Sequence, residues 1–127
     1  MPSHLRETEF LVSCLCAAWC GTCREYRTGF DALQSRFPEV GFIWVDVEDQ
    51  SDIVDELDVE NFPTLVIQRG VRVLFCGPML PQHHLLERLL ETYLAQSEEE
   101  SVAYALGNPE RRAWQGVADI RSRLPVR

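Results

Sequence analysis

Two cysteines, Cys20 and Cys23, are separated by two residues in the stretch AAWCGTCREY, residues 17–26. Cysteines at this spacing have three common uses in proteins. They form a redox-active dithiol, they supply half of a metal site, or they are two ordinary buried thiols. The elements around the pair and the remaining cysteines decide between these interpretations.

A helix is predicted directly after the cysteine pair. Apolar residues recur there at helical spacing, at Tyr26, Phe30, Leu33 and Phe37. Pro38 ends this pattern. Cys20 therefore lies at a helix start, where free backbone N–H groups and the helix dipole stabilise a thiolate. Cys23 lies one turn further on the same face, close enough to form a disulfide with Cys20 and to resolve a mixed disulfide.

A metal site is the second interpretation. Four cysteines, at positions 14, 16, 20 and 23, fall within ten residues, and His83 and His84 are further candidate ligands. Alternate positions of a buried strand point to one face of the sheet, whereas the Cys20–Cys23 pair lies at the end of that strand. We therefore predict no metal and no bound cofactor. His83 and His84 are predicted to face solvent, and Cys76 to belong to the core or to line a groove.

The predicted elements alternate between strands and helices. Residues 10–16 and 40–47 are compact apolar runs, typical of strands buried on both faces. Residues 64–70 and 71–77 flank an Arg–Gly turn and predict a hairpin. Residues 81–96 predict an amphipathic helix. A short helix is also predicted around Ile53, Val54 and Leu57. The order β-α-β-α-β-β-α implies a parallel first pair of strands, an antiparallel last pair and helices on both faces of a mixed sheet.

The sequence changes character after Gln96. The stretch SEEES, residues 97–101, is a linker or a helix start. The stretch NPERRAWQGVADIRSRL, residues 108–124, predicts a helix that begins with Asn108 as its cap and Pro109 at the first helical position. We therefore divide the chain into a domain over 1–96 and a helical C-terminal extension over 97–127.

Composition narrows the classes of function. The chain has 127 residues, contains no lysine and carries a formal net charge of −8, which argues against binding to nucleic acid. The acids concentrate in residues 46–60, most simply a solvated surface. No stretch is apolar enough to span a membrane. Residues 10–19 resemble a signal core, but the residues before them are too acidic. We therefore expect a cytoplasmic protein, in which cysteines are typically catalytic, metal-binding or buried.

Together these motifs resemble the thioredoxin superfamily. The resemblance covers roughly residues 8–95 and is carried by AAWCGTC at 17–23, its strand–helix–strand setting, and FPT at 62–64 ahead of a strand. It implies a cis peptide bond before Pro63. It also implies a substrate groove formed by Trp19, Gly21, Thr22, Phe62, Pro63 and Gly77. The fold class implied is α/β, a mixed sheet of about four strands flanked by helices.

The sequence departs from the family pattern at several points. The ten residues before the first strand are too few for the family's usual extra strand and helix, so the fold is expected to be shortened at its N-terminus. Residues 40–47 would then form an edge strand, which the C-terminal extension or a second subunit is expected to cover. Thr22 replaces the usual proline between the cysteines. Cys14 and Trp44 stand where the family has a buried acid and its lysine partner.

The resemblance implies a thiol–disulfide oxidoreductase that reduces or exchanges protein disulfides. Cys20 would be the nucleophile and Cys23 the resolving thiol. The predicted partners are protein disulfides, a reductase or dithiol donor, and a second copy of the chain joined through the edge strand or the extension. A different class of function stays open: an adaptor or chaperone with this fold that binds one protein partner with little redox turnover.

Overall fold

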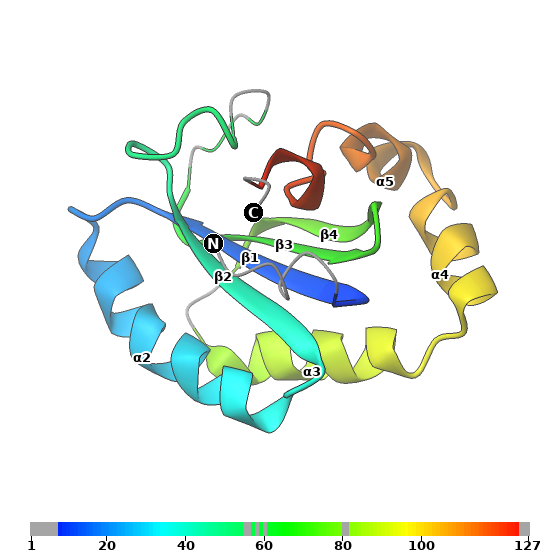
Figure 1. Cartoon of the computed structure of the whole chain (residues 1–127), viewed down its shortest axis with the longest axis horizontal. Coiled ribbons are helices and arrows are strands. Elements are labelled where there is room, and N and C mark those ends of the chain that lie inside the picture. The colour runs from blue at the N-terminus through cyan, green and yellow to red at the C-terminus, as the bar shows by residue number, and fades with distance from the viewer. Residues whose placement is uncertain (1–7, 55–56, 58, 60, 80–81, 125–127) are drawn as a thin grey trace.

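A mixed sheet of four strands forms the centre of the protein. The computed structural model describes residues 8–54, 57, 59, 61–79 and 82–124. The strands are β1 (Phe10–Cys16), β2 (Val40–Asp46), β3 (Thr64–Arg69) and β4 (Arg72–Pro78), arranged in the order β2-β1-β3-β4 (Figure 1). β1 pairs with β2 in parallel and with β3 antiparallel, and β3 and β4 form an antiparallel hairpin. The predicted strands and their pairing are therefore confirmed.

β1 is the central strand that leads to the cysteine pair. All seven of its residues are buried. Because side chains alternate along a strand, Cys14 and Cys16 point into one core cluster, whereas Leu11 and Leu15 point into the other. Both faces of the sheet are covered, which explains why the strand is continuously apolar rather than alternating.

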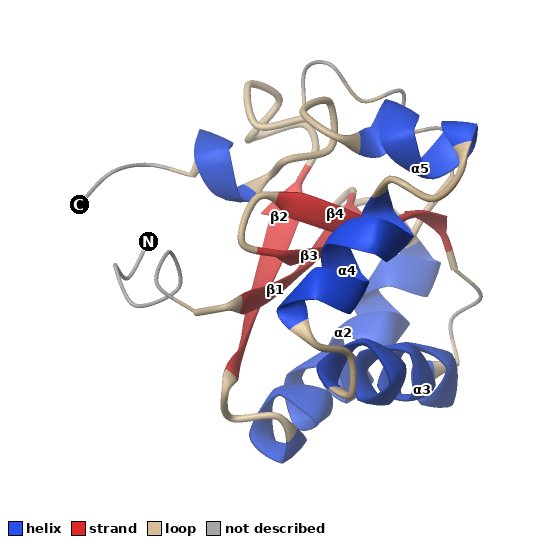
Figure 2. Cartoon of the chain, turned by 90° about the vertical axis from the view of Figure 1, so that its right-hand side faces the viewer, coloured by secondary structure: helices blue, strands red, loops and turns tan. Residues whose placement is uncertain are grey.

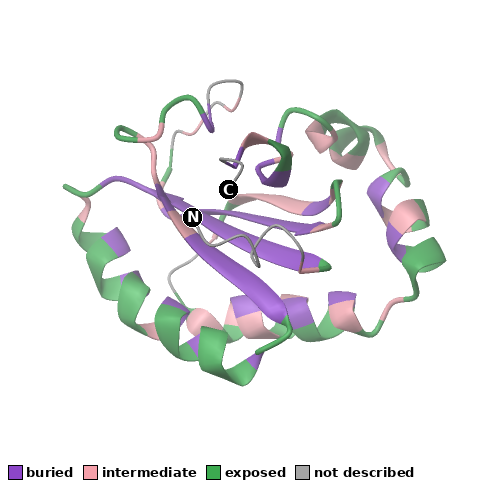
Figure 3. Ribbon diagram, in the orientation of Figure 1, coloured by how far each residue is buried: buried purple, intermediate pink, exposed green. Residues whose placement is uncertain are grey.

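Two helices cover the face of the sheet to which Cys14 and Cys16 point. Helix α2 (Gly21–Arg36) and helix α3 (His83–Leu94) lie side by side on it (Figures 1 and 2). Each helix buries one side and exposes the other (Figure 3), and the fully buried side chains are apolar or aromatic. Helix α2 ends one residue before Phe37, so Pro38 follows the helix as predicted.

The segment after α3 packs on β4 and then covers the other face of the sheet. It contains α4 (Glu98–Ala105), α5 (Pro109–Trp114) and a 3-10 turn, η1 (Arg121–Arg123). Ser97 and Glu100 form a reciprocal capping box at the start of α4, and so SEEES is a helix start. Ala118, Ile120 and Leu124 are buried against the second face of the sheet, and this segment closes the second core cluster.

Three predictions about these elements are wrong. Residues 51–54 form turns, and the described residues between 51 and 59 contain no helix. The helix that begins at Pro109 ends at Trp114, and Gly116 then adopts a φ of 83°, a left-handed conformation that favours glycine. The extension packs on β4 and on the second face of the sheet, not along the edge of β2. A second subunit at that edge stays a prediction.

Within the parts of the chain that the structure describes, no helix combines the length and the apolar character that a membrane-spanning helix needs.

Candidate functional site

Cys20 caps the start of α2 at the end of the loop that leaves β1. Its backbone N–H donates to the carbonyl of Ala17 at 3.0 Å, and its own carbonyl accepts from the N–H of Arg24 at 3.2 Å. The Arg24 guanidinium donates to the carbonyl of Ala18 at 2.9 Å and fastens the loop to the helix. The Cys20 side chain is a half-buried free thiol. The structure thus brings Cys20 to the helix start that the sequence predicted.

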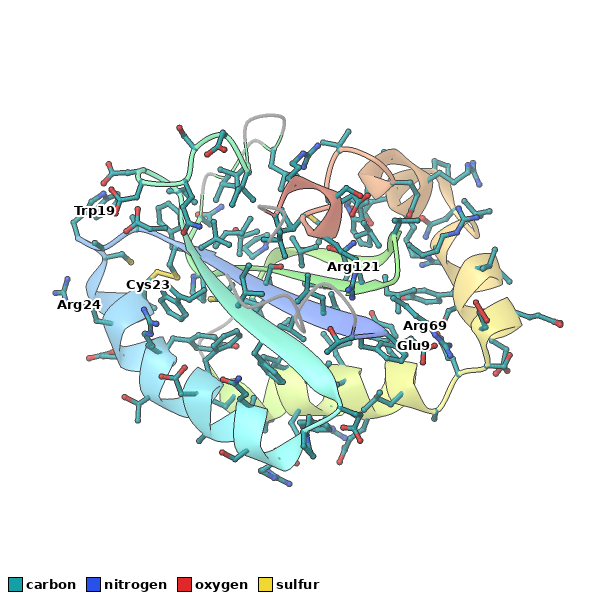
Figure 4. All side chains as sticks on the ribbon, viewed as in Figure 1. Glu9, Trp19, Cys23, Arg24, Arg69 and Arg121 are labelled. Carbon is teal, nitrogen blue, oxygen red and sulfur yellow. A yellow bond between two sulfur atoms is a disulfide. The ribbon has the colours of Figure 1, made fainter. Side chains whose placement is uncertain are left out.

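Cys23 has a different disulfide partner from the one that the sequence predicted. It lies in the first turn of α2, its side chain faces the sheet, and it forms a disulfide with Cys16, the last residue of β1 (Figure 4). The Cα atoms of this pair are 5.9 Å apart, and each residue is only 1% exposed. Cys20 is not part of this disulfide. The Cys20–Cys23 exchange pair therefore stays a prediction, and the structure adds Cys16 as a third cysteine of the site.

Cys14 lies below this disulfide. Its sulfur is 3.8 Å from the sulfur of Cys16 and fully buried. Burial raises the pKa of the Cys14 thiol far above its usual range, and the positive charge of Arg27 offsets only part of that effect. Trp44 pairs with Cys14 across the β1–β2 ladder. The Arg27 guanidinium lies 4.8 Å from the centre of the Trp44 ring. Cys14 therefore lies within the apolar core beneath the disulfide.

The predicted groove residues come from three separate parts of the chain. Trp19 is 64% exposed and makes an edge-to-face contact with Phe62, with ring centres 5.7 Å apart. The Phe62–Pro63 peptide bond is cis, which confirms the expectation drawn from FPT. The carbonyl of Pro63 accepts from the N–H of Met79 at 3.1 Å. Sequence analysis missed Met79, because only the strand pairing brings it to this position.

The other predicted groove residues lie nearby in the fold. Gly21 and Thr22 are exposed in the first turn of α2. Gly77 pairs with Leu65, two residues after Pro63. A cavity of about 270 Å³ is lined by Gly77 and Cys76, among others. Burial raises the pKa of Cys76 to about 11, so this thiol stays protonated near neutral pH. Cys76 thus lines a groove, as predicted.

The two neighbouring histidines differ in their exposure to solvent. His84 is exposed, as predicted. His83 is half-buried, and its ring stacks on Tyr26 with centres 4.6 Å apart, so the prediction that it faces solvent is wrong. A β-carbon placed on Gly29 would lie 1.9 Å from the His83 ring, so the absence of a side chain at Gly29 makes the space for it. Among the described residues, no group of three or more His, Cys, Asp or Glu side chains could hold a metal ion.

A mixed sheet with a Cys-x-x-Cys helix start and a cis-proline ahead of β3 defines a thioredoxin-like protein. Comparison with known proteins specifies the family. The Thioredoxin family model matches residues 3–85. Thioredoxin H2-1 of Oryza sativa subsp. japonica is 34% identical over 68 residues, 54% of this chain and 49% of the rice protein. Thioredoxin of Oryctolagus cuniculus is 46% identical over 58 residues, 45% of this chain and 55% of the rabbit protein.

Solved structures agree with this assignment. The crystal structure of thioredoxin from Trypanosoma brucei brucei superposes with a TM-score of 0.65 and 26% identity, covering 74% of this chain and 82% of that one. The chain spans about half the length of the curated relatives it matches. It belongs to the thioredoxin family.

Proposed function

We propose that the protein is a thiol–disulfide oxidoreductase that reduces or exchanges disulfides in protein substrates. One observation carries the proposal. Cys20 is a free, half-buried thiol at the start of α2, and the exposed Trp19 ring beside it in sequence rests on Phe62, the residue before the cis-proline. A reachable thiol at a helix start, next to an apolar surface, suits attack on an extended peptide that carries a disulfide.

The reaction follows from ordinary thiol–disulfide exchange. The Cys20 thiolate attacks one sulfur of a substrate disulfide and releases the other as a thiolate, which takes up a proton. The reduced Cys23 thiol then attacks Cys20 in the mixed disulfide, so that the substrate leaves fully reduced and a Cys20–Cys23 disulfide remains. A reductase or small dithiol would return the pair to its reduced form. Reduction of the Cys16–Cys23 disulfide has to come before this cycle, because Cys23 attacks only as a free thiol.

The groove residues would hold the substrate during exchange. Trp19 and Phe62 offer apolar surface to the residues that flank the disulfide. The backbone groups of Phe62 would pair with the substrate as an added strand, the way extended peptides join exposed backbone elsewhere. Gly21 and Thr22 are exposed beside Cys20; Gly21 has no side chain and Thr22 has a small one, so they leave room for that strand.

One observation favours a second candidate function. In the structure, Cys23 is bonded to Cys16, and so Cys20 has no free resolving thiol. A protein in that form would capture a partner without turning it over, as an adaptor or chaperone does. A cytoplasmic location, and a homodimer through the β2 edge or the C-terminal extension, stay predictions.

Insulin reduction by dithiothreitol tests the proposal. Dithiothreitol opens the Cys16–Cys23 disulfide, so the parent protein should accelerate insulin precipitation well above background. Cys20→Ser should return the rate to background. Cys76→Ser is the matched control, because Cys76 is also a partly buried free cysteine but lies on β4 rather than at a helix start. The replacement is nearly isosteric, and so this variant should keep the parent rate. No acceleration by a folded, fully reduced parent would favour the adaptor.

A further inference from the structure

The three cysteines of the site differ in exposure and in bonding. Cys20 is half-buried and free, whereas Cys16 and Cys23 are both 1% exposed and joined. Cys23 therefore has a potential partner on each side. Cys20 lies three residues away at the solvent side, and Cys16 lies on the strand beneath.

The backbone places Cys16 and Cys23 for bonding. β1 directs Cys16 to the face that α2 covers, and the N–H of Val47 donates to the Cys16 carbonyl at 2.9 Å, which fixes the end of the strand. The Cα separation of 5.9 Å lies inside the range of about 4.4–6.8 Å found for protein disulfides. The disulfide thus joins β1 and α2, which also pack together through the first core cluster.

We propose that Cys16 is a third exchange cysteine, which takes over Cys23 from the Cys20–Cys23 disulfide and returns Cys20 to its free thiol form. This inference rests on the proposed function, because the cycle of substrate reduction supplies the Cys20–Cys23 disulfide. Its product is the state seen in the structure, a buried disulfide with a free thiol beside the groove.

The step is an isomerisation and needs no further oxidant. The Cys16 thiol loses its proton, and its sulfur attacks Cys23. The Cys16–Cys23 bond forms while the Cys20–Cys23 bond breaks, and the electron pair of the broken bond leaves on Cys20. Cys20 takes up one proton, so the numbers of protons and electrons are unchanged.

The consequence is a change in what the oxidised protein can do. A Cys20–Cys23 disulfide would sit at the groove and could oxidise a dithiol. The Cys16–Cys23 disulfide is buried, so protein dithiols reach it poorly. Cys20 can then still attack a substrate disulfide, but Cys23 cannot resolve the product. Oxidation would thereby convert a turnover enzyme into a form that retains its substrate.

Cys14 is the other cysteine within reach, and it serves as a matched control. Its sulfur lies 3.8 Å from that of Cys16, on the same strand and the same face. Cys14 contacts Cys16 and stays a free thiol while Cys16 is bonded to Cys23, so it is not a member of the exchanging pair. Replacing Cys14 should therefore leave the isomerisation intact.

Time-resolved disulfide mapping tests the proposal. The reduced full chain is oxidised with diamide, quenched with acid at intervals, alkylated and digested for mass spectrometry. In the parent and in Cys14→Ser, the Cys20–Cys23 disulfide should appear first, as a link within one peptide, and then decay. The Cys16–Cys23 pair should then exceed it by at least about tenfold, with Cys20 alkylated. In Cys16→Ser the Cys20–Cys23 pair should persist.

The other outcomes are equally decisive. A parent that holds Cys20–Cys23 at equilibrium would overturn the proposal, and this measurement needs no variant that could fail to fold. Formation of Cys16–Cys23 at the parent rate in Cys20→Ser would also overturn it, because Cys20 would then lie outside the path. Diamide acts without a protein substrate, so failure here is separate from failure of insulin reduction. Insulin reduction with a stable Cys20–Cys23 pair would leave the proposed function standing alone.

Discussion

At the scale of single residues, Cys14 below the cysteine cluster is expected to affect the resolution step. It is fully buried, and Trp44 pairs with it across the ladder, so the site has no acid at this position to accept a proton from Cys23. Cys14→Asp should speed the resolution of mixed disulfides. It should also lower the free energy of unfolding by about 3 kcal/mol, because the carboxyl is placed at a fully buried position.

Single-turnover kinetics between about pH 6 and about pH 9, where thiols begin to ionise, measure this effect. The comparison is best made between Cys16→Ser and the Cys14→Asp, Cys16→Ser double variant, because isomerisation through Cys16 is then absent. Identical rates and pH profiles would show that position 14 takes no part in proton transfer.

Cys76 gives a prediction about the pH dependence of stability. Burial raises its pKa from 9.0 to about 11 in the folded protein. The unfolded chain therefore loses this proton at lower pH than the folded one. The stability contribution is fully present below about pH 9 and is lost as pH rises towards about pH 11. Urea unfolding at several pH values should show a steeper alkaline loss of stability in the parent than in Cys76→Ala. Parallel curves would mean that the thiol ionises equally in both states.

Residue chemistry was the part of the site that the sequence predicted best. The motifs around Trp19, Cys20, Cys23, Phe62 and Pro63 carried the resemblance to the thioredoxin superfamily, and that resemblance implied the groove and the cis bond. The bond between Cys16 and Cys23 was not predictable in the same way. It depends on how α2 packs on the end of β1, which sequence spacing does not specify.

At the scale of elements, strands were easier to predict than turns. The four strands begin and end within one residue of the apolar runs that predicted them. The acidic segment after β2 misled the prediction because Ile53 and Val54 are buried and resemble a helix face. The Asp46 carboxylate accepts from the N–H groups of Glu48 and Asp49, at 2.9 and 3.2 Å, and stabilises a turn instead.

The packing of α2 against α3 gives a prediction about stability at the scale of elements. Gly29→Ala would place a β-carbon 1.9 Å from the His83 ring, which cannot move aside without losing its stacking on Tyr26. We expect a loss of about 2 kcal/mol in the free energy of unfolding, as overpacking typically causes. Most of this loss should disappear when His83→Ala is added, since the two residues are in direct contact.

Urea denaturation of the two single variants and the double variant measures the coupling between Gly29 and His83. Gly21→Ala is the control in the same helix, because its β-carbon would meet nothing closer than 3.7 Å. Additive effects of Gly29→Ala and His83→Ala would contradict the packing described here.

At the scale of the whole molecule, the segment after α3 is tied to the sheet by polar as well as apolar contacts. The fully buried Gln68 of β3 donates to the Asp119 carboxylate at 2.9 Å and accepts from the N–H of Arg121 at 3.1 Å. At the far end of β1 from the cysteine site, Glu9 and Arg69 form an ion pair (Figure 4). Gln68 is the buried polar side chain that specifies where the segment returns to the sheet.

These contacts predict that residues 97–124 unfold together with the sheet. Ile120 is fully buried in the second core cluster with Leu11, Leu15 and Val66. Ile120→Ala should lower the free energy of unfolding by about 3 kcal/mol through the cavity it leaves. It should accelerate hydrogen exchange in β1 as well as in the segment itself, because one cooperative unit loses stability throughout.

The control is Val117→Ala in the same segment. Val117 is 37% exposed, so its truncation should change stability by less than about 1 kcal/mol. Urea unfolding gives the free energies, and hydrogen exchange by mass spectrometry gives the response of residues 10–16. If Ile120→Ala accelerated exchange only after residue 97, the C-terminal extension would be an independent unit. In that case its cover of the second face of the sheet would contribute nothing to the stability of the strand that carries Cys14 and Cys16.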